Sequence, residues 1–268
     1  MRILEKFLCG KENNINTCED GLFIAEKFIA IIDGVTSKSS KSFKGKRSGL
    51  YAKEIICRYL KNYNPQIYNV QMFNEINNIL REEIQSIDEK VSEEDFPRAS
   101  IIIYNDIYKE IWVYGDCQCS INGKIYTNSK KIDELNSELR SFYLEYEIIN
   151  GKSITELMQD DIGRKKISNN LLMQFSFENK LINFGYPVLN GTNIEESMIK
   201  VYSVRTGDEI ILASDGYPFL KSTLEDSEKE LKYLLENDPM CFKIFKSTKG
   251  LQYGNISFDD RTFCKFIV

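Results

Sequence analysis

Three short apolar runs in this chain each end in an aspartate next to a glycine. They read FIAIIDG over residues 28–34, EIWVYGD over residues 110–116 and EIILASDG over residues 209–216. Each run has the length of a β-strand, and its apolar residues are consecutive, so both faces of the strand must be covered. A carboxylate at the end of a buried strand is costly without a partner. The runs therefore constrain the fold and also point to a site at the strand ends.

The order of the predicted elements favours two antiparallel sheets. Turn residues separate short apolar runs into strand pairs, which fall at residues 22–32, 101–114, 117–127 and 198–213, with a last strand at 262–268. The turn at Asn122-Gly123 is typical of a type I′ hairpin. Helical spacing of apolar residues predicts helices at residues 50–60, 70–91 and 224–236 and a mainly helical stretch over 132–175. We expect an α+β fold, a four-layer α-β-β-α sandwich of two mainly antiparallel sheets flanked by helices.

The absence of histidine limits the chemistry more than any other feature of the composition. It excludes Ser-His-Asp and Cys-His catalysis and zinc bound by histidine. The net charge of −5, with both signs interleaved, gives no basic face for nucleic acid and argues against binding to anionic membranes. No apolar stretch reaches the roughly 20 residues that span a bilayer. The seven scattered cysteines favour a reducing compartment, so we expect a cytoplasmic protein.

No repeat, low-complexity segment or clear linker divides the sequence. We therefore expect a single domain over residues 1–268. The oligomeric state is not predictable from these features.

Acidic residues fall at five predicted strand ends. If these ends meet at one edge of the sandwich, the carboxylates gather there and need cations. No arginine or lysine is adjacent in sequence to Asp33, Asp116 or Asp215, so a metal ion is the simplest source of positive charge. Ligation by oxygen alone selects Mg²⁺ or Mn²⁺. A simpler explanation of any one Asp-Gly pair is a turn capped by the aspartate. The acidic residues are Glu19 and Asp20, Asp33, Asp116, Asp215, and Asp259 and Asp260.

In order and rough spacing, these segments resemble the motifs of the metal-dependent type 2C (PPM-type) protein phosphatase family. The matching segments are CED, IAIIDG, WVYGD, ILASDG and DDRTFCKFIV, which together span nearly the whole chain. ILASDG is the most specific of them. Val35 stands where many members have histidine, as apolar residues do in bacterial members. The resemblance implies the sandwich fold predicted above and a phosphomonoesterase, expected to be a serine/threonine protein phosphatase. In such a mechanism a metal-bridged hydroxide attacks phosphorus in line.

The resemblance also implies roles for the acidic residues. Asp33 would bridge two Mn²⁺ or Mg²⁺ ions, and the carbonyl oxygen of Gly34 would bind one of them. Asp215 and Asp259 would complete the other site, and Asp116 would help to hold a third, weaker ion. Asp33 and Asp215 are therefore the expected catalytic residues. The implied metal ligands are Asp33, Gly34, Asp215, Asp259, Asp116, and, through metal-bound water, Glu19 and Asp20.

The sequence departs from the family pattern at the substrate phosphate. The family has an arginine shortly before the acidic doublet, whereas here Lys11 is the nearest cation upstream of Glu19, and the substrate-binding residues are unassigned. The alternative function is therefore a catalytically impaired pseudophosphatase that acts as a regulatory binding module. AIIDGVTS also resembles the start of haloacid-dehalogenase-type phosphatases, but Ile31 occupies the place of their nucleophilic aspartate.

Overall fold

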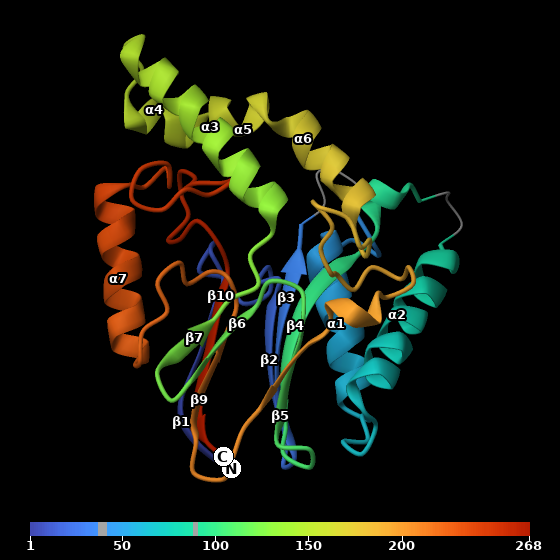
Figure 1. Ribbon diagram of the computed structural model, residues 1–268. Helices are drawn as coiled ribbons and strands as arrows, with labels where there is room; N and C mark the ends of the chain where they lie inside the picture. The colour runs from blue at the N-terminus through green and yellow to red at the C-terminus, as the bar shows by residue number, and fades with distance from the viewer. Residues whose placement is uncertain (37–41, 88–90) are drawn as a thin grey trace.

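The computed structural model describes residues 1–36, 42–87 and 91–268, and it contains two five-stranded sheets packed face to face (Figure 1). The strands are β1 (Arg2–Cys9), β2 (Asp20–Ile24), β3 (Phe28–Val35), β4 (Arg98–Asn105), β5 (Glu110–Tyr114), β6 (Gln118–Ile121), β7 (Lys124–Tyr126), β8 (Lys200–Ser203), β9 (Glu209–Ala213) and β10 (Arg261–Ile267). The first sheet has the order β1-β10-β9-β6-β7 and the second β2-β3-β4-β5-β8. All pairings between these strands are antiparallel, which confirms the predicted sandwich.

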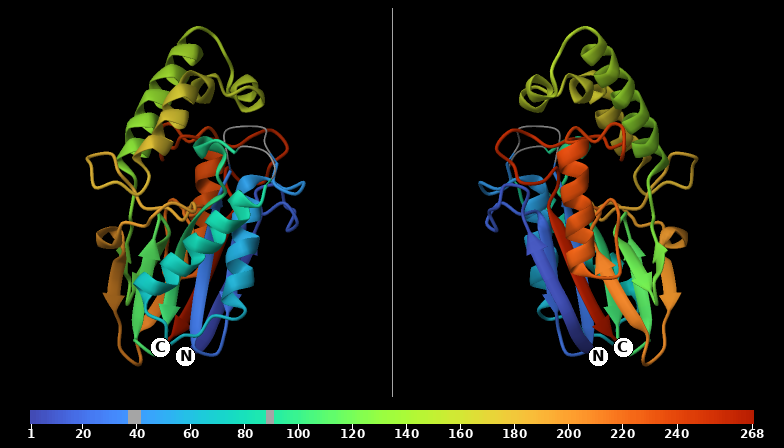
Figure 2. Two further views of the ribbon diagram at one scale, coloured as in Figure 1. Left: turned by 90° about the vertical axis from the view of Figure 1, so that its right-hand side faces the viewer. Right: turned by 90° about the vertical axis from the view of Figure 1, so that its left-hand side faces the viewer.

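Helices cover the outer faces of both sheets. The α-helices of the described residues are α1 (Ser48–Leu60), α2 (Asn69–Gln85), α3 (Lys131–Ile149), α4 (Ile154–Gln159), α5 (Ile162–Lys166), α6 (Ser168–Met173) and α7 (Leu224–Asn237). The views in Figures 1 and 2 place α1 and α2 on the second sheet and α7 beside the first, while α3 to α6 form a cap over one end of the sandwich. Both chain termini lie at the opposite end. None of the described helices combines the length and apolar character needed to cross a membrane.

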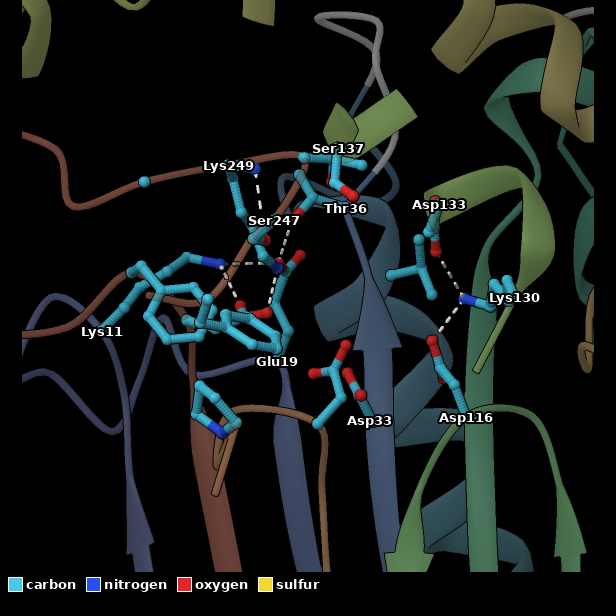
Figure 3. Close-up of a pocket in the computed structure, with 18 of the residues that line it drawn as sticks. Lys11, Glu19, Asp33, Thr36, Asp116, Lys130, Asp133, Ser137, Ser247 and Lys249 are labelled. Carbon is cyan, nitrogen blue, oxygen red and sulfur yellow. Dashed lines mark hydrogen bonds and ion pairs between the residues drawn. The ribbon is translucent and has the colours of Figure 1, made fainter. Parts of the chain in front are cut away.

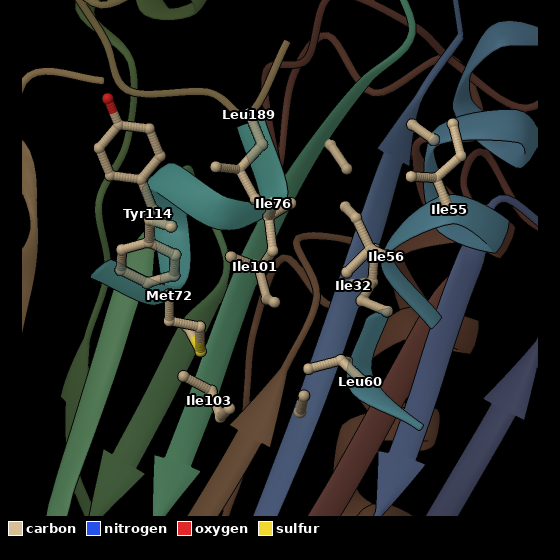
Figure 4. Packing of buried hydrophobic residues seen from close by; sticks show 14 of the residues in the cluster. Ile32, Ile55, Ile56, Leu60, Met72, Ile76, Ile101, Ile103, Tyr114 and Leu189 are labelled. Atoms are coloured by element: carbon tan, nitrogen blue, oxygen red, sulfur yellow. The ribbon is translucent and has the colours of Figure 1, made fainter. Parts of the chain in front are cut away.

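The strand β3 shows why the apolar runs are consecutive. Ile29 and Ile31 point into the core between the two sheets. Ala30 and Ile32 point the other way and pack in a second core against α1 and α2 (Figure 4). Because side chains alternate between the faces of a strand, a strand between two cores needs apolar residues at every position. Ile31 is fully buried in this way, which leaves no nucleophile at the position that a haloacid-dehalogenase-type enzyme requires.

One prediction about the strands was wrong for a long-range reason, and one strand was missed. Residues 198–213 do not form a hairpin, because β8 pairs with β5 in the second sheet and β9 pairs with β10 and β6 in the first. The intervening turn therefore crosses from one sheet to the other. The edge strand β1 was not predicted, since its half-exposed residues include charged side chains. The helix predicted over 70–91 ends at Gln85, and residues 88–90 lie outside the described residues.

Candidate active site

Five strand ends meet at the edge of the sandwich below the cap. β3, β5 and β9 end there, and β2 and β10 begin there. Their side chains line a cavity of about 680 Å³ (Figure 3). The predicted site residues that line it are Glu19, Asp33, Gly34, Asp116, Asp215 and Asp259. Asp20 lies directly opposite Asp33 across the β2–β3 ladder and is buried. The structure thus brings the predicted acidic residues together.

Two aspartates of the cavity form ion pairs with lysines that are not adjacent to them in the sequence. Lys130 Nζ lies 2.5 Å from Asp116 Oδ2, and the hydroxyl of Ser100 donates to Asp116 Oδ1 at 2.5 Å. The ammonium group of Lys249 contacts Asp259 Oδ2. Burial acts to raise the pKa of both carboxyl groups, but the lysines outweigh it and lower the pKa of each. These two aspartates are therefore charged and paired.

Lys11 brings a third positive charge to the cavity. Its Nζ atom lies 3.6 Å from carboxylate oxygens of Glu19, Asp259 and Asp260. Asp260 also accepts hydrogen bonds from the backbone N–H groups of Lys11 at 2.7 Å and Glu19 at 2.9 Å. Asp260 thereby fastens the segment before β2 to the start of β10, which gives it a structural role.

A second group of carboxylates lacks such pairing. Among the described residues, no lysine or arginine forms an ion pair with Asp20, Asp33 or Asp215. Burial raises the pKa of Asp33 well above its usual range, and the charges of Asp215 and Asp20 add to the effect. Burial followed by repulsion from Asp259 and Asp116 raises the pKa of Asp215 to about 7. Burial also raises the pKa of Asp20 to about 8. These three groups favour either a proton or a metal cation.

Neutral hydrogen bonds fix two of the segments that carry these acids. The hydroxyls of Ser214 and Thr262 donate to Asp20 Oδ2 at 2.6 and 2.8 Å, so Asp20 links β2 of one sheet to the ends of β9 and β10 in the other. The side-chain amide of Gln118 donates to the carbonyl oxygens of Ser214 and Tyr217 at 3.1 and 2.7 Å. The turn that carries Asp215 is therefore held on both sides by hydrogen bonds within the protein.

The chemistry of the unpaired group fits a hard divalent cation. The available donors are carboxylate and carbonyl oxygens, which Mg²⁺ and Mn²⁺ prefer. Glu19 Oε1 is buried and has no hydrogen-bond partner among the described residues, so a donor atom beside the cavity is left over. In residues 1–36, 42–87 and 91–268, no three acidic or cysteine side chains converge on one point as metal ligands. The fit therefore rests on charge and donor type.

The metal-free protein should lose stability as the pH rises from 6 to 9. The carboxyl group of an unfolded aspartate titrates near 4, whereas those of folded Asp215 and Asp20 titrate near 7 and 8. Between these values the folded state binds more protons, so the free energy of unfolding falls as the pH rises. The contribution of these two groups to the free energy of unfolding is fully present below about pH 4. It is lost as the pH rises through their pKa values in the folded state. The lowered pKa values of Asp116 and Asp259 act only below about pH 4.

Thermal denaturation in the presence of a chelator measures this dependence. The Asp215→Asn variant is the matched comparison, and its melting temperature should fall less between pH 6 and pH 9. A wild-type melting temperature that stays constant or rises over this range would contradict the charge repulsion described above.

Close backbone contacts explain the glycines that follow Asp33 and Asp215. A Cβ atom on Gly34 would lie 2.4 Å from the carbonyl oxygen of Gly49, and one on Gly216 would lie 2.1 Å from that of Asp260. Neither glycine has a positive φ angle. The two Asp-Gly pairs therefore mark places where a strand end presses against another backbone segment, which a side chain would push apart.

Gly216→Ala should lower the free energy of unfolding by about 1–3 kcal/mol, the usual cost of overpacking. Chemical denaturation measures the loss. Gly21→Ala is the matched control, because its Cβ would approach side chains and not backbone, namely Lys53 at 3.1 Å and Cys57 Sγ at 3.5 Å. Equal effects of the two substitutions would show that the contact with Asp260 is easily relieved.

Comparison with solved structures identifies proteins that have a similar fold. The chain is similar to the serine/threonine phosphatase PstP/Ppp of Mycobacterium tuberculosis, with 11% identity, a TM-score of 0.50 and coverage of 99% of this chain and 98% of the other. The PPM Ser-Thr phosphatase MsPP of Mycobacterium smegmatis gives 12% identity and 0.50 over 100% of both chains. Stp1 of Staphylococcus aureus gives 15% and 0.50 over 98% of this chain and 94% of the other. No family model and no curated protein matches the sequence. The chain therefore has the fold of the PPM-type serine/threonine phosphatases, as its motifs predict.

Proposed function

We propose that this protein is a metal-dependent phosphomonoesterase that removes phosphate from serine or threonine in phosphorylated proteins. The observation that carries the proposal is the group of Asp20, Asp33 and Asp215, whose charges are unpaired among the described residues at the edge of a sandwich with the PPM fold. The cavity of about 680 Å³ has the size of a small-molecule site, and it is open to a phosphorylated side chain.

Asp33 and Asp215 are the proposed catalytic residues. When bound, two Mn²⁺ or Mg²⁺ ions would lower the pKa of a water molecule and offset the charge of the phosphoryl oxygens. Asp33, Asp215 and the carbonyl oxygen of Gly34 are free of lysine ion pairs in the described structure and would hold the ions first. The rest of the proposed ligand set comprises Asp259, Asp116, Glu19 and Asp20.

Lys11 is the proposed contact for the substrate phosphate. Its side chain lines the cavity and is 17% exposed, so its ammonium group reaches both the buried acids and the open space. The side chains of Glu19 and Asp259 hold it in place. A lysine would bind phosphate as a point charge, without the paired hydrogen bonds that an arginine makes.

The test is the initial rate of p-nitrophenyl phosphate hydrolysis as a function of Mn²⁺ concentration. The proposal predicts a rate that requires Mn²⁺ and saturates with it. Phosphoserine, phosphothreonine and phosphotyrosine peptides then separate the substrate classes, and the first two should be hydrolysed faster. Mn²⁺ binding without hydrolysis at millimolar concentrations would instead support the regulatory pseudophosphatase. Absence of Mn²⁺ binding would refute both.

Lys130 should limit how many ions the cavity binds. It occupies Asp116 at 2.5 Å, lies 3.9 Å from Asp133 and stacks over the ring of Tyr186, so it is enclosed as well as paired. Lys130→Met removes this charge and leaves Asp116 as an additional ligand. We expect this variant to bind one more Mn²⁺ per chain, or the same number more tightly, in isothermal titration calorimetry. Lys130→Arg is the control, and identical binding by all three proteins would show that Lys130 does not compete with metal.

A further inference from the structure

The helix α3 carries an apolar stripe on its solvent-facing side. The stripe consists of Leu135, Leu139, Phe142, Tyr146 and Ile149, which follow one another at alternating spacings of four and three residues. At about 100° per residue, they fall within an arc of about 80°. Leu135 is 54% exposed, Phe142 62%, Tyr146 58% and Ile149 83%. Four large apolar side chains exposed along one helix form a continuous patch, which is rare on the surface of a protein without a partner there.

The opposite face of α3 is the one that anchors the helix in the cap. Leu144 packs in a buried cluster with Leu157 of α4 and with Phe242. Arg140 is fully buried, and its guanidinium lies 2.7 Å from Asp161 Oδ2. Since α3 is already fixed by this face, the apolar stripe is not a misplaced core contact. It is a second surface on the same helix.

A row of glutamates borders the stripe on one side. Glu134, Glu138 and Glu145 lie about 80° from the centre of the stripe in the same direction around the helix. All three are exposed, and Glu138 remains 64% exposed although Lys246 reaches it at 2.5 Å. This acidic row would repel the same row of a second copy and an anionic membrane surface.

We propose that α3 docks an amphipathic α-helix of another protein, with apolar residues at the same spacing and a row of lysine or arginine. Alternating spacings of four and three are the pattern that lets side chains of one helix insert between those of another. The stripe is about 22 Å long, which matches about two heptads of a partner. The acidic row determines the charge of that partner, and its orientation, through complementary pairs along one edge.

The docking surface adjoins the cavity. Asp133 and Ser137, from the first turns of α3, line the cavity wall that Figure 3 shows. A helix on the stripe would therefore hold its protein beside the cavity mouth. None of the five stripe residues lines the cavity, and in the acidic row Glu134 does so while Glu138 and Glu145 do not. The proposal therefore does not depend on the phosphatase activity.

Two synthetic helical peptides test the proposal with the full-length protein. Both are three heptads long with leucine at the apolar positions, and the flanking positions are lysine in one and glutamate in the other. Fluorescence anisotropy should show the lysine peptide binding at least about tenfold more tightly than the glutamate peptide. The Phe142→Glu/Tyr146→Glu variant should lose this binding. Ile107→Glu, at another exposed apolar residue outside α3, should keep it.

Reversal of the acidic row gives the decisive comparison. The Glu138→Lys/Glu145→Lys variant should prefer the glutamate peptide, while its melting temperature stays close to that of wild type. Equal binding of the two peptides, or binding that survives Phe142→Glu/Tyr146→Glu, would overturn the proposal. A wild-type dimer in sedimentation that the Phe142→Glu/Tyr146→Glu variant dissociates would also overturn the proposal, because the stripe would then mediate self-association. If the wild-type protein does not hydrolyse p-nitrophenyl phosphate, the proposed enzymatic function is refuted. The outcomes of the peptide-binding experiments are unaffected by that result.

Discussion

Asp33→Asn abolishes phosphate hydrolysis without loss of the fold: this is the expected result with the largest effect on activity. The amide keeps the shape of the carboxyl group but removes the charge that would hold a divalent ion. If that ion contributes several kcal/mol to the transition state, the rate falls by about a thousandfold or more. In the metal-free protein the same change relieves the repulsion that Asp33 shares with Asp215 and Asp20. Its melting temperature at pH 8 should therefore equal or exceed that of wild type.

Asp238→Asn is the matched control, because it replaces a buried aspartate whose charge is compensated by hydrogen bonds. Asp238 is also buried, but its carboxylate accepts backbone N–H bonds from Phe242, Lys243 and Ile244 at 2.8 to 3.0 Å. This substitution should lower the melting temperature, because an amide replaces a well-satisfied charge. Turnover by Asp33→Asn close to that of wild type, or a fall in its melting temperature as large as that of Asp238→Asn, would disprove the assigned role.

Arg98→Ala should give the largest loss of stability, about 3–5 kcal/mol in the free energy of unfolding. Arg98 is 2% exposed at the start of β4, and its Nε atom lies 2.5 Å from Glu178 Oε1. Its guanidinium also donates to the carbonyl oxygen of Phe96 at 2.6 Å and stacks over the ring of Phe175. Truncation would leave the buried carboxylate of Glu178 without its cation, and it would leave a cavity at the start of β4.

Urea denaturation of wild type, Arg98→Ala and a variant that removes both charges measures this effect. The Arg98→Met/Glu178→Gln variant removes both charges and should be less destabilised than Arg98→Ala, since no unpaired charge remains buried. A loss below about 1 kcal/mol for Arg98→Ala would mean that water or a rearranged lysine reaches Glu178. Equal losses in the two variants would indicate that packing of Arg98, and not its charge, stabilises this region.

Local sequence patterns predicted the parts of this fold whose signals are local. The consecutive apolar residues of β3 required a core on each face, and the structure has both. The turn at Asn122-Gly123 takes the positive φ angles of a type I′ hairpin. The convergence of Asp33, Asp116 and Asp215 followed from three strands that end in the same way, because strand ends of a sandwich share its edges.

The features that sequence analysis missed depend on contacts between distant segments. The assignment of β8 and β9 to different sheets is decided by their partners, and each run alone fits either sheet. Lys130 and Lys249 come from the start of α3 and from an irregular segment after α7, so no local pattern links them to Asp116 or Asp259. The charge state of the site could therefore not be derived from residues adjacent to the acids. The spacing within α3 was present in the sequence, but only its exposure distinguishes a docking stripe from core.

The position of the chain ends has a practical consequence for handling the protein. Arg2 pairs with Ile267 across the β1–β10 ladder, so both termini leave the sandwich together, at the end far from the cavity (Figures 1 and 2). A tag, a fluorophore or a tether to a sensor surface at either terminus would leave the cavity and α3 facing the solution. The same proximity allows a short linker to join the two ends, with new termini opened in a surface loop. Such a circularly permuted chain would report, by its folding, whether β1 must be made before β10 for the first sheet to assemble.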